Sequence, residues 1–316
     1  MQVKKIADSM ADCVGNTPLV RLSRLFGPTG VEALAKIEFY NPGGSVKDRA
    51  AFRIIQEAEK KGILKKGMTV VEATSGNMGT GLAIACAIKG YKMVAVMPET
   101  MSLERRHMLR SLGAEVYLTK VTGEQKGKIT IDDYYEITGI AKKIAGERGG
   151  FWADQFNNFG NLLAHYEGTG REILDQTDGR LDVFVAAVGS GGTLIGAAKA
   201  IKEHNPKIKV IAVEPTSSSV LQGGEPGQHK IQGVGAGFVP PFFDAKFVDG
   251  YVSVTDEECR VAAQRLAKEE GIFAGYSSGA NIAASLKVSN TMKKGEILVT
   301  MINDTGLKYL STDLFT

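Results

Sequence analysis

The sequence predicts an α/β protein built from two doubly wound open sheets. Short apolar runs of strand length alternate with amphipathic helical windows, and the same strand–loop–helix plan occurs in both halves of the chain. The length of 316 residues fits two domains or one large α/β domain, and the repeated plan favours two. Ligands of open α/β sheets bind outside the carboxyl ends of the strands, so the loops that follow strands are the candidate sites.

In the first half, an apolar run predicts a strand at residues 33–40, and a βαβαβ alternation follows it. The strands and helices of that alternation are expected, in order, at residues 68–73, 79–89, 92–97, 102–112 and 115–118. Such a rhythm predicts a parallel sheet with helices on both faces.

The strongest strand signal is the almost continuously apolar run at residues 181–188, which is typical of a buried central strand. Helices are expected at residues 132–148, 160–176, 192–202 and 256–270, and further strands at residues 209–213 and 297–302. Residues 223–241 are rich in glycine and proline and are expected to form a long functional loop.

Composition narrows the function class. A net charge of +3 without a basic stripe argues against a nucleic-acid partner. The 3 cysteines are widely spaced and odd in number, which fits a reducing cytoplasm and not a disulfide framework. The 4 histidines lack metal-ligand spacing, so no metal is expected. The N-terminus has no signal-peptide run, and no stretch reaches the length of a membrane span.

Lys47 is the first candidate for chemistry. It follows a Pro42-Gly43-Gly44 turn and an apolar strand, and glycines let a backbone bend sharply and approach a ligand closely. A lysine delivered there is suited to form a Schiff base with an aldehyde cofactor. Because most lysines are solvated surface charges, this interpretation depends on three later loops.

The loop Gly189-Ser190-Gly191-Gly192-Thr193 follows the buried strand and opens a helix. Its backbone N–H groups and the helix dipole favour an anion, and Thr193 adds a hydroxyl. The alternatives are a tight turn or a dinucleotide fingerprint with Glu214 as the ribose ligand. A fingerprint needs a third glycine where the chain has Leu194, so a single phosphate suits the loop better.

Three other segments have both a functional and a structural interpretation. Hydroxyl and amide groups in residues 74–79 suit a carboxylate, although Thr, Ser and Asn also cap helices. Residues 277–280 lie before a helix expected at residues 281–284, where an N-cap is equally favoured. Residues 233–237 form either a flexible loop or a ligand flap. Gln155 by itself is typical of a structural amide.

Together these motifs resemble the fold-type II pyridoxal-phosphate enzymes, the tryptophan synthase β-like group that contains cysteine synthase (O-acetylserine sulfhydrylase) and cystathionine β-synthase. The resemblance is carried by residues 14–20, 98–106, 229–238 and 309–311 in addition to the loops above. It implies a pyridoxal 5′-phosphate (PLP) site in a cleft between a smaller mobile domain at residues 42–153 and a larger PLP-binding domain at residues 1–41 and 154–316. It also implies a cytoplasmic homodimer with amino-acid and sulfide or thiol substrates, and no membrane or nucleic-acid partner.

The resemblance implies a role for each matching residue. Lys47 is the expected Schiff-base lysine and catalytic base. Asn77 is expected to bond the cofactor's 3′ oxygen, and Ser277 to face its pyridine nitrogen. The other cofactor-binding residues expected are Gly189, Ser190, Gly191, Gly192 and Thr193. The substrate-binding residues expected are Thr74, Ser75, Asn77, Met78, Gln155 and, on a closing flap, Gly235.

The reaction implied by this resemblance is replacement of the β-substituent of O-acetylserine by sulfide, through α-aminoacrylate, to give L-cysteine. Cystathionine formation, β-cyanoalanine formation and cysteine desulfhydration use the same intermediate and stay open. Sulfhydrylases usually carry Thr where this chain has Met78, as plant β-cyanoalanine synthases do, so the nucleophile is open; Met78 is equally typical of a core residue. A nicotinamide-dependent dehydrogenase and a catalytically silent binding protein are the remote alternatives.

Overall fold

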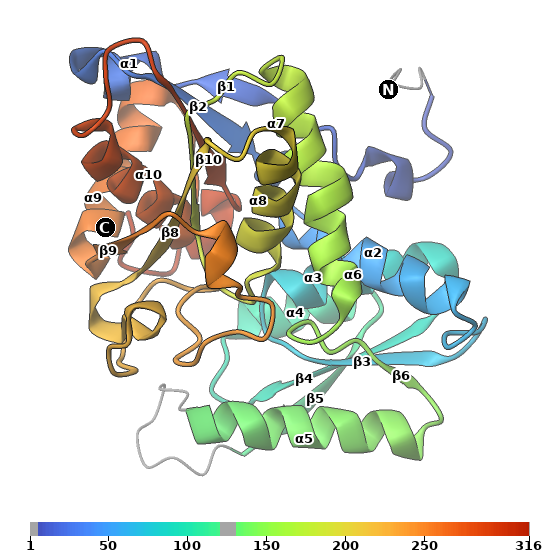
Figure 1. The fold of residues 1–316 in the computed structure, drawn as a ribbon. Helices are drawn as coiled ribbons and strands as arrows, with labels where there is room; N and C mark the ends of the chain where they lie inside the picture. The colour runs from blue at the N-terminus through green and yellow to red at the C-terminus, as the bar shows by residue number, and fades with distance from the viewer. Residues whose placement is uncertain (1–5, 121–130, 316) are drawn as a thin grey trace. The chain divides into compact units, whose positions relative to one another are not determined.

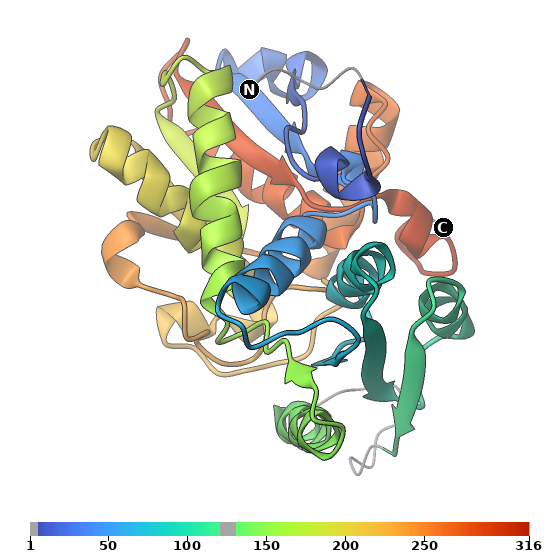
Figure 2. The same cartoon turned by 90° about the vertical axis from the view of Figure 1, so that its right-hand side faces the viewer.

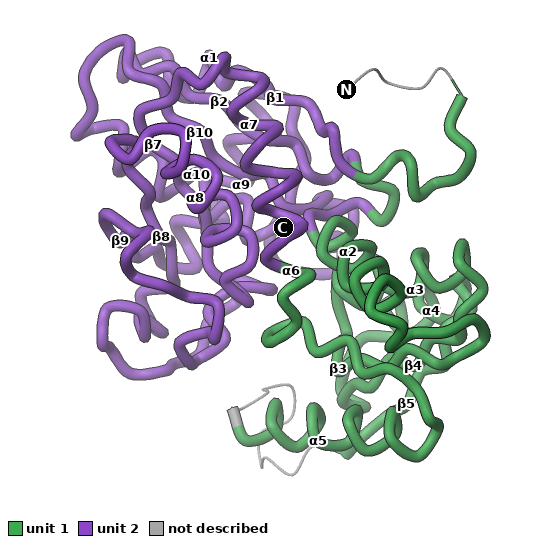
Figure 3. The backbone as a smooth tube through the Cα atoms, turned by 45° about the vertical axis from the view of Figure 1, so that its right-hand side comes forward, with its two compact units in different colours: residues 1–14, 41–43, 47–161 green, residues 15–40, 44–46, 162–316 purple. Residues whose placement is uncertain are grey.

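The structure of the chain is a computed structural model that describes residues 6–120 and 131–315. Contacts divide the chain into two compact units (Figure 3). Unit 1 comprises residues 1–14, 41–43 and 47–161, and unit 2 comprises residues 15–40, 44–46 and 162–316. The domain boundaries expected at residues 42 and 153 stay a prediction.

Unit 1 is built on a parallel four-stranded sheet with the strand order β5-β4-β3-β6. The strands are β3 (Thr69–Ala73), β4 (Lys92–Pro98), β5 (Glu115–Thr119) and β6 (Phe151–Trp152). The helices are α2 (Lys47–Lys60), α3 (Asn77–Lys89), α4 (Leu103–Ser111) and α5 (Ile131–Glu147). Helix α5 covers one face of this sheet, and α2 and α3 lie on the other (Figures 1 and 2).

Burial in β3 explains why unit 1 has helices on both faces of its sheet. Val70 is buried in the cluster that contains Leu82 of α3, whereas Val71 is buried in the cluster that contains Ile137 and Ala141 of α5. Successive strand residues point to opposite faces, so an apolar run requires a cover on each side. The doubly wound arrangement expected from the sequence is confirmed in this unit.

Unit 2 has a six-stranded sheet with the order β1-β2-β10-β7-β8-β9, in which only β1 is antiparallel to its neighbour. The strands are β1 (Leu19–Arg21), β2 (Glu32–Ile37), β7 (Val183–Ala187), β8 (Lys209–Pro215), β9 (Gly250–Val254) and β10 (Ile297–Ile302). The helices are α1 (Ser23–Phe26), α7 (Arg171–Gln176), α8 (Gly192–His204), α9 (Asp256–Glu270) and α10 (Tyr276–Ser289).

Strand β7 lies inside this sheet, with helices over both faces (Figure 1). Val183 and Val185 are buried in the cluster that also contains residues of α9 and α10. Phe184 and Ala186 are buried in the cluster that contains residues of α8. The continuous apolar run therefore has the structural role that the sequence predicts for it.

The helix expected at residues 160–176 is divided into three segments. These are α6 (Phe159–Leu163), a π-helical segment (Ala164–Gly170) and α7. A π-helical segment is a local widening of a helix that often occurs near functional residues. It places His165 and Thr169 in the interior of unit 2, both with none of their surface exposed.

The sequence interpretation was wrong about the start of α10. Residues 277–280 were expected before a helix at residues 281–284, but α10 begins at Tyr276 and contains them. Small polar residues have weak helix propensity, yet every residue from 276 to 285 is buried. Tertiary packing outweighs propensity here, as it does in most helices of globular proteins.

Helices α1 and α2 and strands β1, β6 and β9 were not expected. The signal for α2 is Ala51, Ile54, Ile55 and Ala58, which are spaced to form one helical face and are all buried. Strands β1 and β6 are only 3 and 2 residues long, too short for a period of two to be visible. No helix within the described ranges is long and apolar enough to cross a membrane.

Helices α9 and α10 approach closely at Gly279, which gives a stability prediction. A Cβ atom at this position would lie 2.1 Å from the carbonyl oxygen of Cys259 in α9. We expect Gly279→Ala to lower the free energy of unfolding by about 1–3 kcal/mol, because the helices must move apart. Urea unfolding followed by circular dichroism measures the change.

The matched control is Gly139→Ala in α5. Gly139 is exposed, and a Cβ atom there would meet no atom within 4 Å. This substitution should stabilise the protein by up to about 1 kcal/mol, since alanine is the better helix former. Equal effects of the two substitutions would contradict the close helix approach.

Candidate functional site

Lys47 is the first residue of helix α2 in unit 1 and is partly buried. The chain just before it is held by Asp48, whose carboxylate accepts a hydrogen bond from the backbone N–H of Gly43. An acidic side chain in the first turn also interacts favourably with the helix dipole. Lys47 therefore lies at a fixed helix start and not in an open loop.

Thr74 lies between β3 and α3 in unit 1. Its backbone N–H donates to the carbonyl oxygen of Val96 at 2.9 Å, and its Oγ1 accepts from the backbone N–H of Gly79 at 3.1 Å. The hydroxyl therefore satisfies one of the N–H groups in the first turn of α3. Thr74 lies two residues before the N-cap Gly76, so its hydroxyl supports the start of α3 from outside the cap position, and its contact with a substrate stays a prediction.

The other candidate residues of the 74–79 segment differ in burial. Asn77 begins α3 and is partly buried. Ser75 Oγ accepts a hydrogen bond from Nη1 of Arg105 in α4 at 3.4 Å, which brings a positive charge to a loop expected to bind a carboxylate. Met78 is only 2% exposed and packs in the α3 side of the core. Its burial favours the packing interpretation of this methionine.

Gln155 follows β6 and is joined to the end of β3. Its backbone N–H donates to Oε1 of Glu72 at 3.4 Å, and its carbonyl oxygen accepts from Nδ2 of Asn161 at 2.8 Å. Glu72 is two residues before Thr74, so these bonds bring together two segments that the sequence assigned to one substrate site. Glu72 thus links the backbone of Gln155 to the end of β3 that leads to Thr74.

Glu72 is buried with 3% of its surface exposed. Burial raises the pKa of Glu72 to about 8, because the charged form loses its hydration, and the nearby Asp154 carboxylate raises this pKa further. Hydrogen bonds from Gln155 and Asp154 offset part of the rise. Burial also raises the pKa of Asp154 itself. Glu72, two residues before Thr74, therefore keeps its proton at neutral pH.

In unit 2, the loop Gly189-Ser190-Gly191-Gly192-Thr193 joins β7 to α8. Gly191 is the N-cap of α8, has a left-handed backbone with φ of +84°, and carries no capping side chain. The first N–H groups of α8 therefore lack side-chain caps, at the positive end of the helix dipole. Backbone donors, a dipole and the Thr193 hydroxyl form a donor set that suits a phosphate group.

His165 holds Thr193 at this loop. Its Nε2 lies 3.2 Å from Thr193 Oγ1, and its Nδ1 lies 2.9 Å from Thr169 Oγ1. Because the imidazole is fully buried between two hydroxyls, it fixes the position of the Thr193 side chain. His165 has no metal-ligand spacing and was not among the expected site residues. Its spacing of four residues from Thr169 on one helical face was the available signal.

Strand β7 brings the unit 2 candidates together at its carboxyl end. The backbone N–H of Gly235 donates to the carbonyl oxygen of Val188 at 2.9 Å, so the expected flap lies beside the phosphate loop. From α10, Asn281 Oδ1 accepts from the N–H of Ala187 at 2.7 Å, and its Nδ2 donates to the carbonyl oxygen of Met301 at 2.8 Å. These bonds fix α10, which carries Ser277, against β7 and β10.

Ser277 is 5% exposed and occupies the first turn of α10. Its Oγ accepts a hydrogen bond from Nδ2 of Asn303 at 3.1 Å. Asn303 follows β10 directly, and residues at the carboxyl ends of parallel strands are the ones that contact ligands in such sheets. That position was the signal for Asn303, which had no role in the sequence interpretation.

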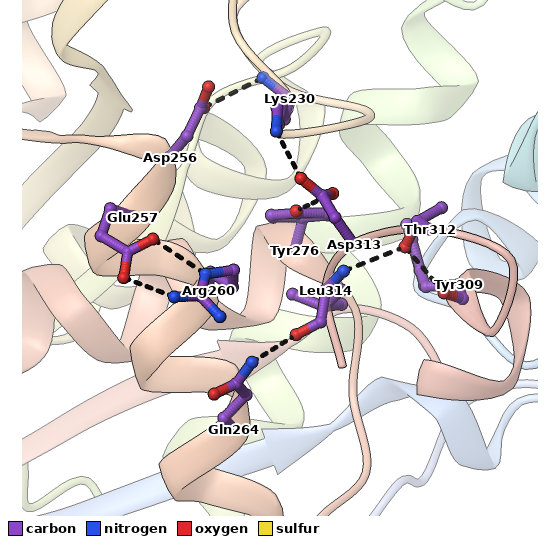
Figure 4. A network of polar contacts seen from close by, with 10 residues as sticks. All are labelled: Lys230, Asp256, Glu257, Arg260, Gln264, Tyr276, Tyr309, Thr312, Asp313 and Leu314. Carbon is purple, nitrogen blue, oxygen red and sulfur yellow. Dashed lines mark hydrogen bonds and ion pairs between the residues drawn. The ribbon is translucent and has the colours of Figure 1, made fainter. Parts of the chain in front are cut away.

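The beginning of α10 is also tied to the C-terminal segment (Figure 4). Tyr276 Oη donates to Oδ1 of Asp313 at 2.6 Å, and Lys230 forms an ion pair with Asp313 Oδ2. These two hydrogen bonds lower the pKa of Asp313. Lys230 belongs to the long loop at residues 223–241, so this network joins the loop, the C-terminal segment and the residue before Ser277.

In the described ranges, no group of three or more His, Cys, Asp or Glu side chains is placed to hold a metal ion.

The raised pKa of Glu72 gives a pH prediction. Between pH 4.5 and about 8 the folded carboxyl keeps a proton that the unfolded chain has lost, so folding is increasingly disfavoured as the pH rises. Relative to Glu72→Gln, the wild type should lose up to about 1.4 kcal/mol of unfolding free energy per pH unit in this window. Urea unfolding of both proteins at several pH values measures the difference.

Glu99→Gln, at an exposed site in unit 1, is the control and should give a pH profile parallel to that of the wild type. If the difference between wild type and Glu72→Gln does not vary with pH, the buried carboxyl is not retaining its proton.

The comparisons with known proteins cover nearly the whole chain. The family described as pyridoxal-phosphate dependent enzyme matches residues 10–304. A cysteine synthase of Staphylococcus aureus is 44% identical over 313 residues, which are 99% of this chain and 98% of the relative.

Solved structures agree with this match. The structure of an O-ureido-L-serine synthase has a TM-score of 0.91 at 41% identity, and the alignment covers 98% of this chain and 95% of that one. A hydrogen sulfide-producing enzyme from Fusobacterium nucleatum has a TM-score of 0.89 at 40% identity, with 96% of this chain and 100% of that chain covered. The expected fold is confirmed, and the nicotinamide alternative is not supported. The chain belongs to the family of pyridoxal-phosphate dependent enzymes and is an enzyme of the cysteine synthase type.

Proposed function

We propose that the protein replaces the acetoxy group of O-acetylserine with sulfide to form L-cysteine. The observation that carries the proposal is the Gly189 to Thr193 loop at the uncapped start of α8, since its donor set fits the phosphate of PLP. The reaction type is supported by the 44% identity to a cysteine synthase over 99% of the chain. When bound, PLP supplies an electron sink that stabilises negative charge at the substrate Cα.

Residues of both units are assigned to the cofactor in this proposal. In unit 2, the phosphate is held by the N–H groups of residues 189–193 and by the Thr193 hydroxyl, which His165 positions. Ser277 hydrogen-bonds the ring nitrogen, and in unit 1 Asn77 bonds the 3′ oxygen. Lys47, at the fixed start of α2, would hold the aldehyde of the cofactor through Nζ.

Lys47 also acts as the base of the reaction. With the substrate amine held by the cofactor, the free Nζ of Lys47 would remove the proton from the substrate Cα. The β-substituent would then leave with its bonding electrons, and sulfide would add at the β-carbon. Lys47 would finally return the proton to Cα, which completes L-cysteine. The amine of Lys47 is thus used twice, once to bind the cofactor and once to move a proton.

The substrate carboxylate is assigned to residues 74–77 and Gln155 in unit 1. Arg105 adds positive charge beside Ser75. Glu72 is a neutral acid that accepts a hydrogen bond from the backbone of Gln155. A protonated Glu72 does not repel the substrate carboxylate as a second anion would. Gly235 is assigned to a flap that closes over the substrate. Met78 contributes through packing, and its assignment to the substrate site is the least supported of the set.

A second candidate is release of hydrogen sulfide from cysteine, in which the thiol of cysteine is the β-substituent that leaves. The 40% identity to a hydrogen sulfide-producing enzyme favours it.

We further propose that the protein is a homodimer in a reducing cytoplasm and that its smaller domain, at residues 42–153, is mobile. The free cysteines fit such a compartment, since Cys86 and Cys259 are buried and Cys13 is exposed without a disulfide partner.

Lys47→Ala tests the proposed function. Wild-type protein should form cysteine from O-acetylserine and sulfide, and the variant should be about 10²–10⁴-fold slower, as expected for a missing general base. The variant should also lose the visible absorbance of covalently held PLP. Lys60→Ala, at the exposed end of the same helix, is the matched control and should keep both properties.

The same assay separates the candidate reactions. O-acetylserine, O-phosphoserine, serine and cysteine are each tested against sulfide, cyanide and homocysteine. Preference for O-acetylserine with sulfide supports the proposal, whereas faster sulfide release from cysteine supports the second candidate. Full activity of Lys47→Ala would contradict the assignment of the base.

Thr193→Val tests the phosphate site. Loss of a hydrogen bond to a charged group should weaken PLP binding about 10- to 100-fold in an equilibrium titration of the apoprotein. Thr193→Ser keeps the hydroxyl and should bind PLP nearly as the wild type does. Pyridoxal, which has no phosphate, should bind both variants and the wild type alike. An equal loss for PLP and pyridoxal would mean that Thr193 acts away from the phosphate.

A further inference from the structure

Asn303 lies where three segments of unit 2 meet. Its backbone N–H donates to Ser278 Oγ at 2.9 Å, and its carbonyl oxygen accepts from the N–H of Val46 at 2.8 Å. Its side-chain Nδ2 donates to Ser277 Oγ at 3.1 Å. One residue therefore holds two hydroxyls of α10 and the backbone immediately before Lys47.

The amide contact restricts what the Ser277 hydroxyl can do. A serine hydroxyl has one proton to donate and two lone pairs to accept with. Because Asn303 Nδ2 is a donor, it occupies a lone pair of Ser277 and leaves the hydroxyl proton for another acceptor. A hydroxyl that accepts one hydrogen bond also becomes a stronger donor of the next. Ser277 is 5% exposed, so bulk water is not a ready alternative partner.

We propose that Asn303 is a positioning residue that keeps the Ser277 hydroxyl as a donor toward the ring nitrogen of the cofactor. This inference rests on the proposed function, in which Ser277 contacts that nitrogen. A nitrogen that accepts a hydrogen bond stays unprotonated, whereas a protonated nitrogen would need Ser277 as an acceptor. An unprotonated ring is the weaker electron sink, which suits a reaction that expels a β-substituent early.

Asn303 also holds the backbone that leads to Lys47. Val46 N–H and Ser45 are both held by the chain after β10, the first through Asn303 and the second in a bridge to Asp304. The segment that delivers Lys47 and the hydroxyl that faces the ring are thus fixed by neighbouring residues of one strand end. The backbone bonds of Asn303 do not depend on its side chain, so its side chain can be changed without releasing Val46.

Asn303→Asp is the decisive variant, because a carboxylate only accepts hydrogen bonds. Ser277 would then donate to Asp, and its lone pairs would face the ring nitrogen. The readout is the nitrogen-15 NMR signal of PLP labelled at the ring nitrogen, bound to the resting protein. We expect the wild-type signal at the position of an unprotonated pyridine, and a shift toward the protonated form in Asn303→Asp.

Asn303→Ala provides a second, independent measurement through cofactor affinity. Ser277→Ala should weaken PLP binding about 10-fold, and Asn303→Ala about 3-fold. The double variant should be no weaker than Ser277→Ala, since Asn303 acts only through that hydroxyl. Ser278→Ala is the matched control: it removes the acceptor of the Asn303 backbone N–H, leaves the amide contact intact, and should not move the NMR signal.

The outcomes separate this inference from the proposed function. If Ser277→Ala moves the ring-nitrogen signal but both Asn303 variants leave it at the wild-type position, the role of Asn303 is overturned and the proposed function stands. If the wild type binds no PLP, or Ser277→Ala changes neither the signal nor the affinity, the proposed contact of Ser277 fails, and the inference fails with it.

Discussion

The burial of β7 on both faces is the constraint on which the rest of unit 2 depends. Val185 packs toward α10 and Phe184 toward α8, so the strand has no freedom to rotate or slip without exposing one of them. Its carboxyl end is fixed as a consequence, and the loop that follows is fixed with it. Asn281 adds a second restraint there, because its side chain bonds the backbone of both β7 and β10. The glycine loop can therefore be short and poor in side chains while its N–H groups keep one direction.

Unit 1 holds its candidate substrate loops in a different way, through buried polar groups. Glu72 is enclosed at the end of β3, and the backbone of Gln155 bonds to it across the sequence. A buried carboxyl is costly when charged, and a neutral acid avoids most of that cost while still accepting hydrogen bonds. The arrangement stabilises the relative position of two loops, provided that the proton stays in place.

The sequence predicted the regular framework well because that framework depends on local pattern. Alternating burial in β3 and β7 is visible as continuous apolar runs, and the helix after each run has a visible period. Loop residues such as Gly191 and Thr193 were identifiable because their chemistry is unusual for a turn. The start of α10 was missed because Ser277 and Ser278 are helical only through burial against the rest of unit 2. No local rule contains that information.

The residues that the sequence did not predict act through partners distant along the chain. His165 reaches Thr193 across 28 positions, and Asn303 reaches Ser277 across 26. Each has an ordinary local context, and its importance comes only from the side chain that the fold places beside it. Sequence reasoning finds the groups that contact a ligand more readily than the groups that aim them, because only the first carry a recognisable chemical motif.

The helix starts differ in how their first backbone N–H groups are satisfied. Surface helix α9 begins with a full capping box, in which Thr255 and Glu258 satisfy each other's backbone N–H groups. Helices α8 and α10 have Gly191 and Gly275 as their N-cap residues, and neither N-cap has a capping side chain. A missing cap costs a helix about 0.5–2 kcal/mol, and an anion at the same N–H groups restores an equivalent interaction. A ligand that binds only the folded state raises its stability, so under the proposed function cofactor binding at the start of α8 would be coupled to folding stability.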